Sequence, residues 1–75
     1  MSKLPILNYT QLIKKVKKAS FVFERQGKRS HEFWVNYETK RIIMVPRHPQ
    51  KTIPIGILKS IIKESGLTVD ELLKL

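Results

Sequence analysis

The sequence predicts an α+β fold in which helices pack on one three-stranded antiparallel sheet. Three observations lead to this prediction: apolar residues recur at helical spacing near both ends of the chain, the middle holds three runs rich in aromatic and β-branched residues, and short turn-like segments separate those runs. The predicted order of elements is α-β-β-β-α-α. Because 75 residues suffice for one small hydrophobic core, we expect residues 1–75 to form a single domain.

The first helix is predicted to begin after Asn8, which can cap it, with Gln11 three residues later, as a capping box requires. Leu7 and Leu12 can then form a hydrophobic staple around the cap. Apolar residues continue at helical spacing, and lysines occupy the positions between them: Leu12, Ile13, Val16 and Ala19 alternate with Lys14, Lys15, Lys17 and Lys18. We interpret the lysines first as the solvated face of this helix and only second as a track for phosphates.

Three strands are predicted over residues 21–25, 30–36 and 41–45. A turn centred on residues 38–39 places His31 opposite Pro46 in the second and third strands. A three-residue loop after Gln26 would place Arg25 opposite His31. The predicted shared apolar face comprises Phe21, Phe23, Phe33, Val35, Ile42 and Met44.

Alternation along the second strand places Trp34 on the face opposite to that apolar set. Its ring could stack on a base, but we expect it to be covered by the last helix or by a partner. Glu32 lies on the same side as Trp34, so a catalytic pair of Glu32 with His31 is not expected.

Two further helices are predicted after the strands. One starts near Pro54 and stops at Gly66, a usual C-terminal glycine position. Thr68 and Glu71 form a second capping box, stapled by Leu67 and Leu72, which opens a short last helix. The residues expected to be buried in the longer helix are Ile57, Leu58, Ile61 and Ile62.

The charge of the chain indicates a polyanionic partner. Fifteen Lys and Arg residues against six Asp and Glu residues give a net charge of +9, and the pI is near 10.2. Such an excess favours nucleic acid over a solubilising surface or an acidic protein partner. The absence of cysteine excludes disulfides and thiolate zinc sites, and with no apolar run long enough for a signal peptide or membrane span we expect a cytoplasmic protein.

The candidate site is the run RQGKRSH, residues 25–31, together with VPRH, residues 45–48. It sets His31 among cations that can hold a phosphate, and an imidazole can take a proton from a ribose hydroxyl. The alternative is a histidine at the sheet edge whose nitrogens are satisfied by the backbone. Ser30 is expected to hydrogen-bond rather than to act as a nucleophile. His48 is expected to contact RNA or the backbone, and two histidines without a nearby carboxylate make a poor metal site, so no metal or other cofactor is expected.

The order and spacing of these pieces resemble the HicA (YcfA-like) mRNA interferase toxins over about residues 8–73. The matching pieces are Phe21, Arg25-Gln26, Ser30-His31, Val45-Pro46 with His48, Lys51, Gly56 with Leu58-Lys59-Ser60-Ile61, and Gly66-Leu67-Thr68. The resemblance implies a double-stranded-RNA-binding-domain-like fold, ribonuclease activity on mRNA that does not need the ribosome, an essential histidine at His31, and a HicB antitoxin that covers it. Two positions depart from the family pattern, since Ser20 and Arg29 stand where the family usually has glycine.

Together these observations predict the endoribonuclease toxin of a type II toxin-antitoxin system, with His31 as a metal-independent general base. The residues expected to bind RNA are Arg25, Lys28, Arg29, Ser30, Arg47, His48 and Lys51. The alternative is a non-catalytic RNA-binding module of the same fold, either a decayed toxin or a free RNA binder. An ordinary double-stranded-RNA-binding domain carries a lysine cluster at the start of its last long helix, whereas here Lys51 stands alone near that start.

Overall fold

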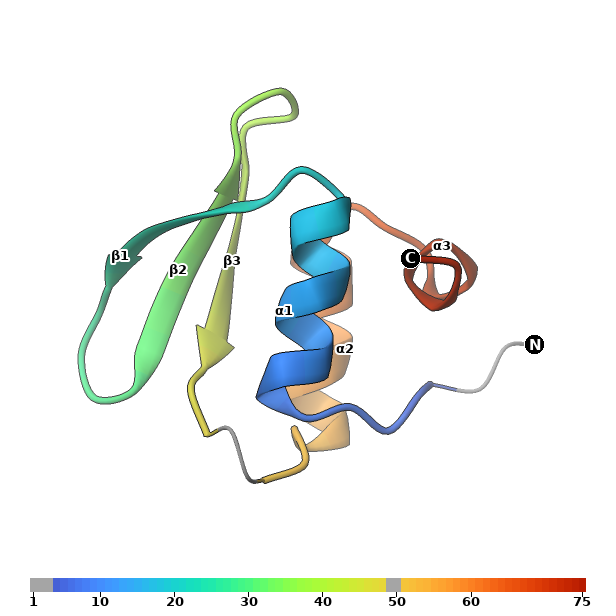
Figure 1. Cartoon of the computed structure of the whole chain (residues 1–75), viewed down its shortest axis with the longest axis horizontal. Coiled ribbons are helices and arrows are strands. Elements are labelled where there is room, and N and C mark those ends of the chain that lie inside the picture. Colours follow the sequence, from blue (N-terminus) through green and yellow to red (C-terminus); the bar gives the residue numbers. More distant parts are fainter. Residues whose placement is uncertain (1–3, 49–50) are drawn as a thin grey trace.

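A computed structural model describes residues 4–48 and 51–75, and it places two long helices side by side against one face of an antiparallel sheet (Figure 1). The sheet has the strand order β1-β2-β3. The elements are α1 (Tyr9–Lys18), β1 (Val22–Gln26), β2 (His31–Asn36), β3 (Arg41–Pro46), α2 (Ile55–Ser65) and α3 (Val69–Leu73). The predicted fold class and element order are confirmed, and the α-β-β-β-α arrangement is consistent with a double-stranded-RNA-binding-domain-like fold. No helix in the described part of the chain has the length and apolar character needed to cross a membrane.

The predicted helix ends are confirmed. Asn8 caps α1 through a capping box with Gln11, and Thr68 caps α3 in the same way. Helix α2 ends at Gly66, whose φ of 78° is in the left-handed region that glycine adopts without strain. The Lys15 ammonium donates to the backbone oxygens of Leu72 and Leu75 at 3.2 Å, and these hydrogen bonds fix α3 against α1.

The core lies between the helices and the sheet face that carries Trp34, Ile43 and Val45. This is the opposite face from the one that the sequence pattern favoured. Of the residues predicted to share one face, Val35 is buried there, while Ile42 and Met44 are 44–50% exposed. The β1 residues of that set lie on the Trp34 side instead, with Phe21 in the core cluster and Phe23 opposite Trp34 and 50% exposed. The pattern was ambiguous because both faces of β3 carry large apolar side chains. The expected burial of Trp34 is correct, with its cover coming from the α1 side, where the Lys17 ammonium lies 5.8 Å from the ring centroid.

The predicted pairing of β2 with β3 is confirmed, with His31 opposite Pro46 and Phe33 opposite Met44. The predicted pairing of β1 with β2 is wrong. Arg25 lies opposite Phe33 rather than His31, and Phe23 lies opposite Trp34 rather than Phe33. The register shifts between Phe23 and Arg25. Such a bulge adds an unpaired residue to one strand and moves the residues beyond it to the other face, and alternation alone does not reveal it.

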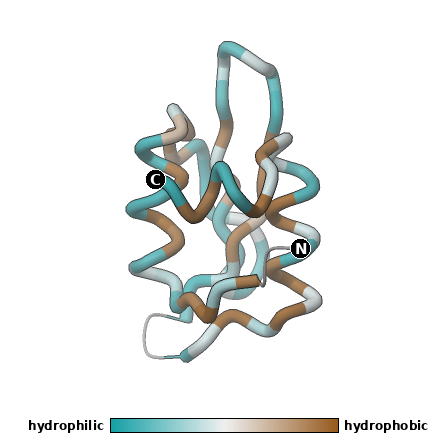
Figure 2. Tube along the Cα trace, turned by 90° about the vertical axis from the view of Figure 1, so that its right-hand side faces the viewer, coloured by the Kyte–Doolittle hydropathy of each residue, from teal (hydrophilic) through white to brown (hydrophobic). Residues whose placement is uncertain are grey.

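The turn between β2 and β3 projects beyond the rest of the molecule and is mostly hydrophilic (Figure 2). Asn36 anchors it from the end of β2, because its side-chain oxygen accepts from the Glu38 and Thr39 amides and its side-chain nitrogen donates to the Ala19 carbonyl. Asn36 is buried with these bonds satisfied. This turn lies at the far end of the strands from His31.

Candidate functional site

His31 is the first residue of β2 and lies on the sheet face that the helices leave uncovered. Its side chain is partly exposed. Within the described residues, neither a side chain nor a backbone group forms a hydrogen bond or ion pair with the imidazole. The ring is therefore available to a ligand, whereas the alternative expected its nitrogens to be satisfied by the backbone.

The loop between β1 and β2 is folded tightly around His31. The Gly27 amide donates to the His31 carbonyl at 2.7 Å, and the His31 amide donates to the Lys28 carbonyl at 3.2 Å. Gln26 donates from its side-chain amide to the Arg29 carbonyl at 3.4 Å. A side chain at Gly27 would place its Cβ only 2.5 Å from the Phe33 ring, so any residue other than glycine would require this ring to move. These contacts keep Lys28 and Arg29, both exposed, next to the histidine.

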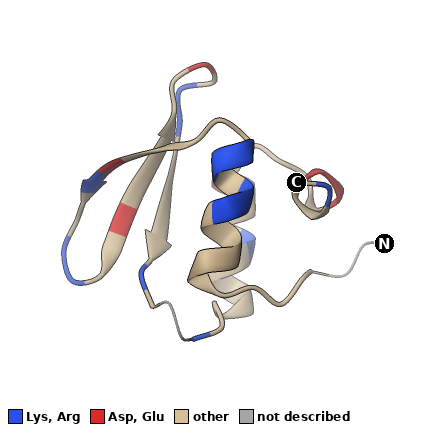
Figure 3. Cartoon of the chain, in the orientation of Figure 1, with Lys and Arg blue, Asp and Glu red and all other residues tan. Residues whose placement is uncertain are grey.

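The segment after β3 joins the same site. The Arg47 amide donates to the Ser30 carbonyl at 2.7 Å, which extends the β2–β3 pairing by one hydrogen bond. The His48 amide bonds to the Pro46 carbonyl, and the Lys51 amide bonds to the His48 carbonyl at 3.0 Å. Figure 3 shows the resulting arrangement, with basic residues on the β1–β2 loop, just past β3 and on the segment leading to α2, all at one end of the sheet.

Arg25 is placed differently from the expectation. Its guanidinium carbon lies 4.2 Å from the centroid of the Phe33 ring, a cation–π distance. Its Nε is also 3.6 Å from a Glu24 carboxylate oxygen. Because of the strand bulge, Arg25 lies opposite Phe33, two residues from His31 along β2, rather than opposite His31 itself. It remains on the same uncovered face of the sheet as the histidine.

A buried carboxylate lies behind the site. Glu32 faces the helices, is 6% exposed, and accepts from the Tyr9 hydroxyl at 2.5 Å and from the Trp34 indole at 3.2 Å. Its second oxygen lies 4.0 Å from the Arg47 Nε. Burial, together with the hydrogen bond to Glu32 and the negative charge there, raises the pKa of Tyr9 to about 12. Because Glu32 faces the helices and His31 lies on the uncovered face, the prediction that the two residues lie on opposite faces is correct.

Sequence reasoning identified Glu32 but assigned it no partner, and it missed Tyr9 altogether. Tyr9 is the first residue of α1, 23 residues before its carboxylate partner. Nothing local in the sequence marks such a contact. The one signal in the sequence is that Glu32 alternates with Trp34 along the strand, and Trp34 is buried on the same face.

Both positions that depart from the resembled family have left-handed backbones. Ser20 has φ 75° and Arg29 has φ 59°. Glycine adopts this region without cost, whereas other L-residues are strained by about 1–2 kcal/mol. The structure thus keeps the loop geometry that glycine favours while carrying a different side chain at each position. At Arg29 that side chain adds a cation to the site.

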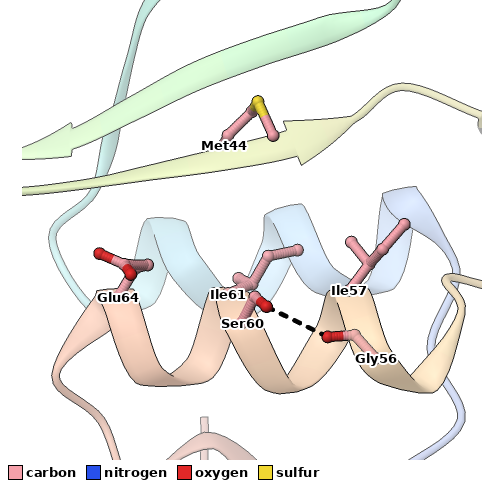
Figure 4. A pocket seen from close by; sticks show the side chains of 6 residues that line it. All are labelled: Met44, Gly56, Ile57, Ser60, Ile61 and Glu64. Carbon is pink, nitrogen blue, oxygen red and sulfur yellow. Dashed lines mark hydrogen bonds between the residues drawn. The ribbon is translucent and has the colours of Figure 1, made fainter.

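An apolar groove of about 340 Å³ runs between the outer edge of β3 and the exposed side of α2 (Figure 4). Met44 forms one wall, and the facing wall is Gly56, Ile57, Ser60, Ile61 and Glu64 from α2. Ile57 was expected to be buried, but it is 41% exposed because it faces this groove. The groove continues the uncovered face of the sheet, on which Val22 and Ile42 are also about half exposed.

A partly exposed histidine thus lies between two segments that carry four basic residues: Lys28, Arg29, Arg47 and Lys51. Such a site can hold a phosphate and exchange a proton with a neighbouring hydroxyl. Among residues 4–48 and 51–75, no cluster of three or more histidine, cysteine or acidic side chains is placed to bind a metal ion.

Comparison with protein families finds a match over most of the chain. The model of a family described as the HicA toxin of bacterial toxin-antitoxin systems matches residues 9–67. The matched segment begins at α1, ends just past α2 and includes every candidate site residue. A comparison with curated proteins found no match.

Proposed function

Because the chain belongs to the HicA toxin family, we propose that it is the toxin of a type II toxin-antitoxin system and that it cleaves mRNA without the ribosome. The observation that carries this proposal is the position of His31, which is accessible on the uncovered face of the sheet and bordered by cationic segments on both sides. A toxin that acts on RNA needs a group that exchanges protons near neutral pH beside groups that hold phosphate. The net charge of +9 supports a polyanionic substrate, and we place the reaction in the cytoplasm.

In the proposed reaction, His31 acts as a general base. A neutral imidazole nitrogen takes the proton of a ribose 2′-OH, and the 2′-oxygen attacks the adjacent phosphorus. The bond from phosphorus to the 5′-oxygen breaks, which leaves a 2′,3′-cyclic phosphate on one fragment. The leaving 5′-oxygen takes a proton and becomes a hydroxyl on the other fragment. His48 or a water molecule would supply this second proton, and no metal ion is required at any step.

The cations of the loop would stabilise the negative charge that develops on the phosphoryl oxygens. Lys28 and Arg29 are held near His31 by backbone hydrogen bonds of their own loop, and Arg47 by the bond of its amide to Ser30. Fixed donors of this kind contribute several kcal/mol, about 3–4 kcal/mol for a single one, to a transition state in comparable sites. Arg25, stacked on Phe33, would bind a phosphate further along the strand. His48, Lys51 and Ser30 complete the proposed RNA-binding set.

Single-stranded or looped RNA is the proposed substrate. Attack by the 2′-OH requires that the nucleophile, phosphorus and leaving oxygen lie in line, and a regular A-form helix hinders this arrangement. Unpaired nucleotides can adopt it, and their bases are also free to be recognised.

The proposed partner is a HicB-type antitoxin that covers His31. The face that carries His31 also presents Val22, Ile42 and Met44, each 44–50% exposed, and it continues into the groove beside α2. Exposed apolar side chains in such a group are typical of a protein contact rather than of an RNA contact. The net charge of +9 makes an acidic protein the best complement.

The rival function, a non-catalytic RNA-binding module, shares the basic surface and differs only in the chemistry of His31. The experiment that separates the two incubates purified protein with a long mRNA in EDTA and compares wild type with His31→Ala on a gel. We expect fragments with wild type and intact RNA with the variant. If wild type binds the RNA and leaves it intact, or if the variant cuts equally well, the catalytic role of His31 is refuted. Growth arrest on induction, relieved by the same substitution, is the cellular counterpart.

A further inference from the structure

The buried Glu32 carboxylate lies directly behind the candidate site, and the reaction proposed above does not use it. Its two oxygens have different partners. One accepts from the Tyr9 hydroxyl at 2.5 Å and from the Trp34 indole at 3.2 Å. The other lies 4.0 Å from the Arg47 Nε. The core therefore satisfies one oxygen with neutral donors and leaves the other facing a cation.

This arrangement makes the carboxylate a fixed anion. The Glu32 side chain is 8% exposed, whereas that of Arg47 is 57% exposed. An exposed arginine normally samples many rotamers, which it must give up when it binds a phosphate. An anion held rigidly by the core restricts those rotamers in advance. It faces the Nε of the guanidinium, so the terminal nitrogens remain available, and these can bind a phosphate.

The backbone of Arg47 is tied to the same strand. Its amide donates to the Ser30 carbonyl at 2.7 Å, and its side chain reaches Glu32. The two anchoring residues flank His31 in the sequence. The Arg47 side chain therefore lies with Glu32 on the helix side of the sheet, at the end of the strands where His31 begins β2.

We propose that Glu32 is a positioning residue, which holds the Arg47 guanidinium at the same end of the sheet as His31 in the orientation that receives an RNA phosphate. This inference rests on the proposed RNA substrate. It predicts the direction in which RNA binding changes when the charge of Glu32 is removed. If Glu32 only neutralised Arg47, removing its charge would strengthen RNA binding. If it orients Arg47, removing its charge weakens RNA binding.

Glu32→Gln tests the inference, because a glutamine keeps an oxygen for Tyr9 and Trp34 but loses the charge that faces Arg47. Two quantities are measured. NMR relaxation of the Arg47 Nε–H group reports how well the side chain is ordered, and the Kd of a short unpaired RNA is measured in the His31→Ala background, where the RNA is not cut. We expect lower order of Arg47, RNA binding weakened by about two- to tenfold, and no further weakening when Arg47→Ala is already present.

The matched control is Glu38→Gln, which makes the same charge change in the exposed β2–β3 turn and should alter neither quantity. Unchanged order of Arg47, tighter or unchanged RNA binding, or an equal loss of binding in the Arg47→Ala background would each overturn the positioning role. If the His31→Ala protein binds no RNA while the order of Arg47 still falls, the coupling of Glu32 to Arg47 stands and the proposed RNA substrate is refuted.

Discussion

Replacing Arg29 with glycine removes a strained backbone conformation and a cation of the candidate site in one step. Arg29 has φ 59°, where an L-residue costs about 1–2 kcal/mol relative to glycine. Glycine also increases the conformational entropy of the unfolded chain, which offsets about 0.4–1 kcal/mol of this gain in stability. We therefore expect Arg29→Gly to raise the free energy of unfolding by about 0.5–1 kcal/mol. For a domain of this size that corresponds to a Tm higher by about 2–8 °C.

Lys40 supplies a matched control, because it has φ 61° and carries the same charge in the turn at the other end of the strands. Lys40→Gly should stabilise the fold by a similar amount and change the net charge equally. Thermal unfolding of both variants tests the first expectation. For RNA binding we expect a difference. Only Arg29→Gly should weaken it, and the dependence of log Kd on log salt concentration should become shallower by about 0.7 for each phosphate that the protein no longer neutralises.

Two results would show these expectations to be wrong. Destabilisation by Arg29→Gly would mean that the arginine stabilises the fold by more than its backbone strain costs. Equal weakening of RNA binding by Lys40→Gly would mean that only net charge matters, and that Arg29 has no special place at the site.

Three further expectations follow from other parts of the structure. In a Tyr37→Phe background, the ultraviolet titration of the remaining Tyr9 should give a pKa near 12. Since the folded-state pKa exceeds the usual value of 10, the stability from the Tyr9–Glu32 hydrogen bond is complete below pH 10 and should be lost as the pH rises from 10 to about 12. A midpoint of the Tyr9 titration near pH 10 would exclude the buried hydrogen bond. Gly27→Ala should lower stability by about 1–3 kcal/mol in urea unfolding, because the new Cβ would meet the Phe33 ring at 2.5 Å, and an unchanged midpoint would show that the ring moves aside freely. Met44→Asp should leave the Tm nearly unchanged, since the side chain is 44% exposed, yet weaken antitoxin binding by about tenfold or more in calorimetry; unchanged affinity would place the antitoxin elsewhere.

Local signals in the sequence were sufficient for the helix ends and for one strand pair. The caps at Asn8 and Thr68 depend on hydrogen bonds between residues three apart, and the turn after Asn36 sets the pairing of β2 with β3. Each of these features is encoded within a few neighbouring residues. The order of elements follows from them.

The features that were mispredicted or missed depend on interactions between distant residues. The bulge in β1 shifts the register between Phe23 and Arg25, and no residue in that strand marks it. The covered face includes Glu32, a polar residue that the core accepts because Tyr9 and Trp34 donate to it. A pattern of apolar residues counts such a position as exposed. His31 lies at the start of β2 and is partly exposed, but the buried residues behind it could only be found in three dimensions.

The proposed catalytic role of His31 can be measured as the single-turnover rate of cleavage of one RNA in EDTA, for wild type and for His31→Ala at saturating protein. Saturation removes differences in binding, so the rate reports the chemical step alone. We predict that the variant cuts about 10²- to 10⁴-fold more slowly, the usual contribution of a general base, with the Kd for RNA unchanged. Equal rates for the two proteins would contradict the assignment of His31 as the general base.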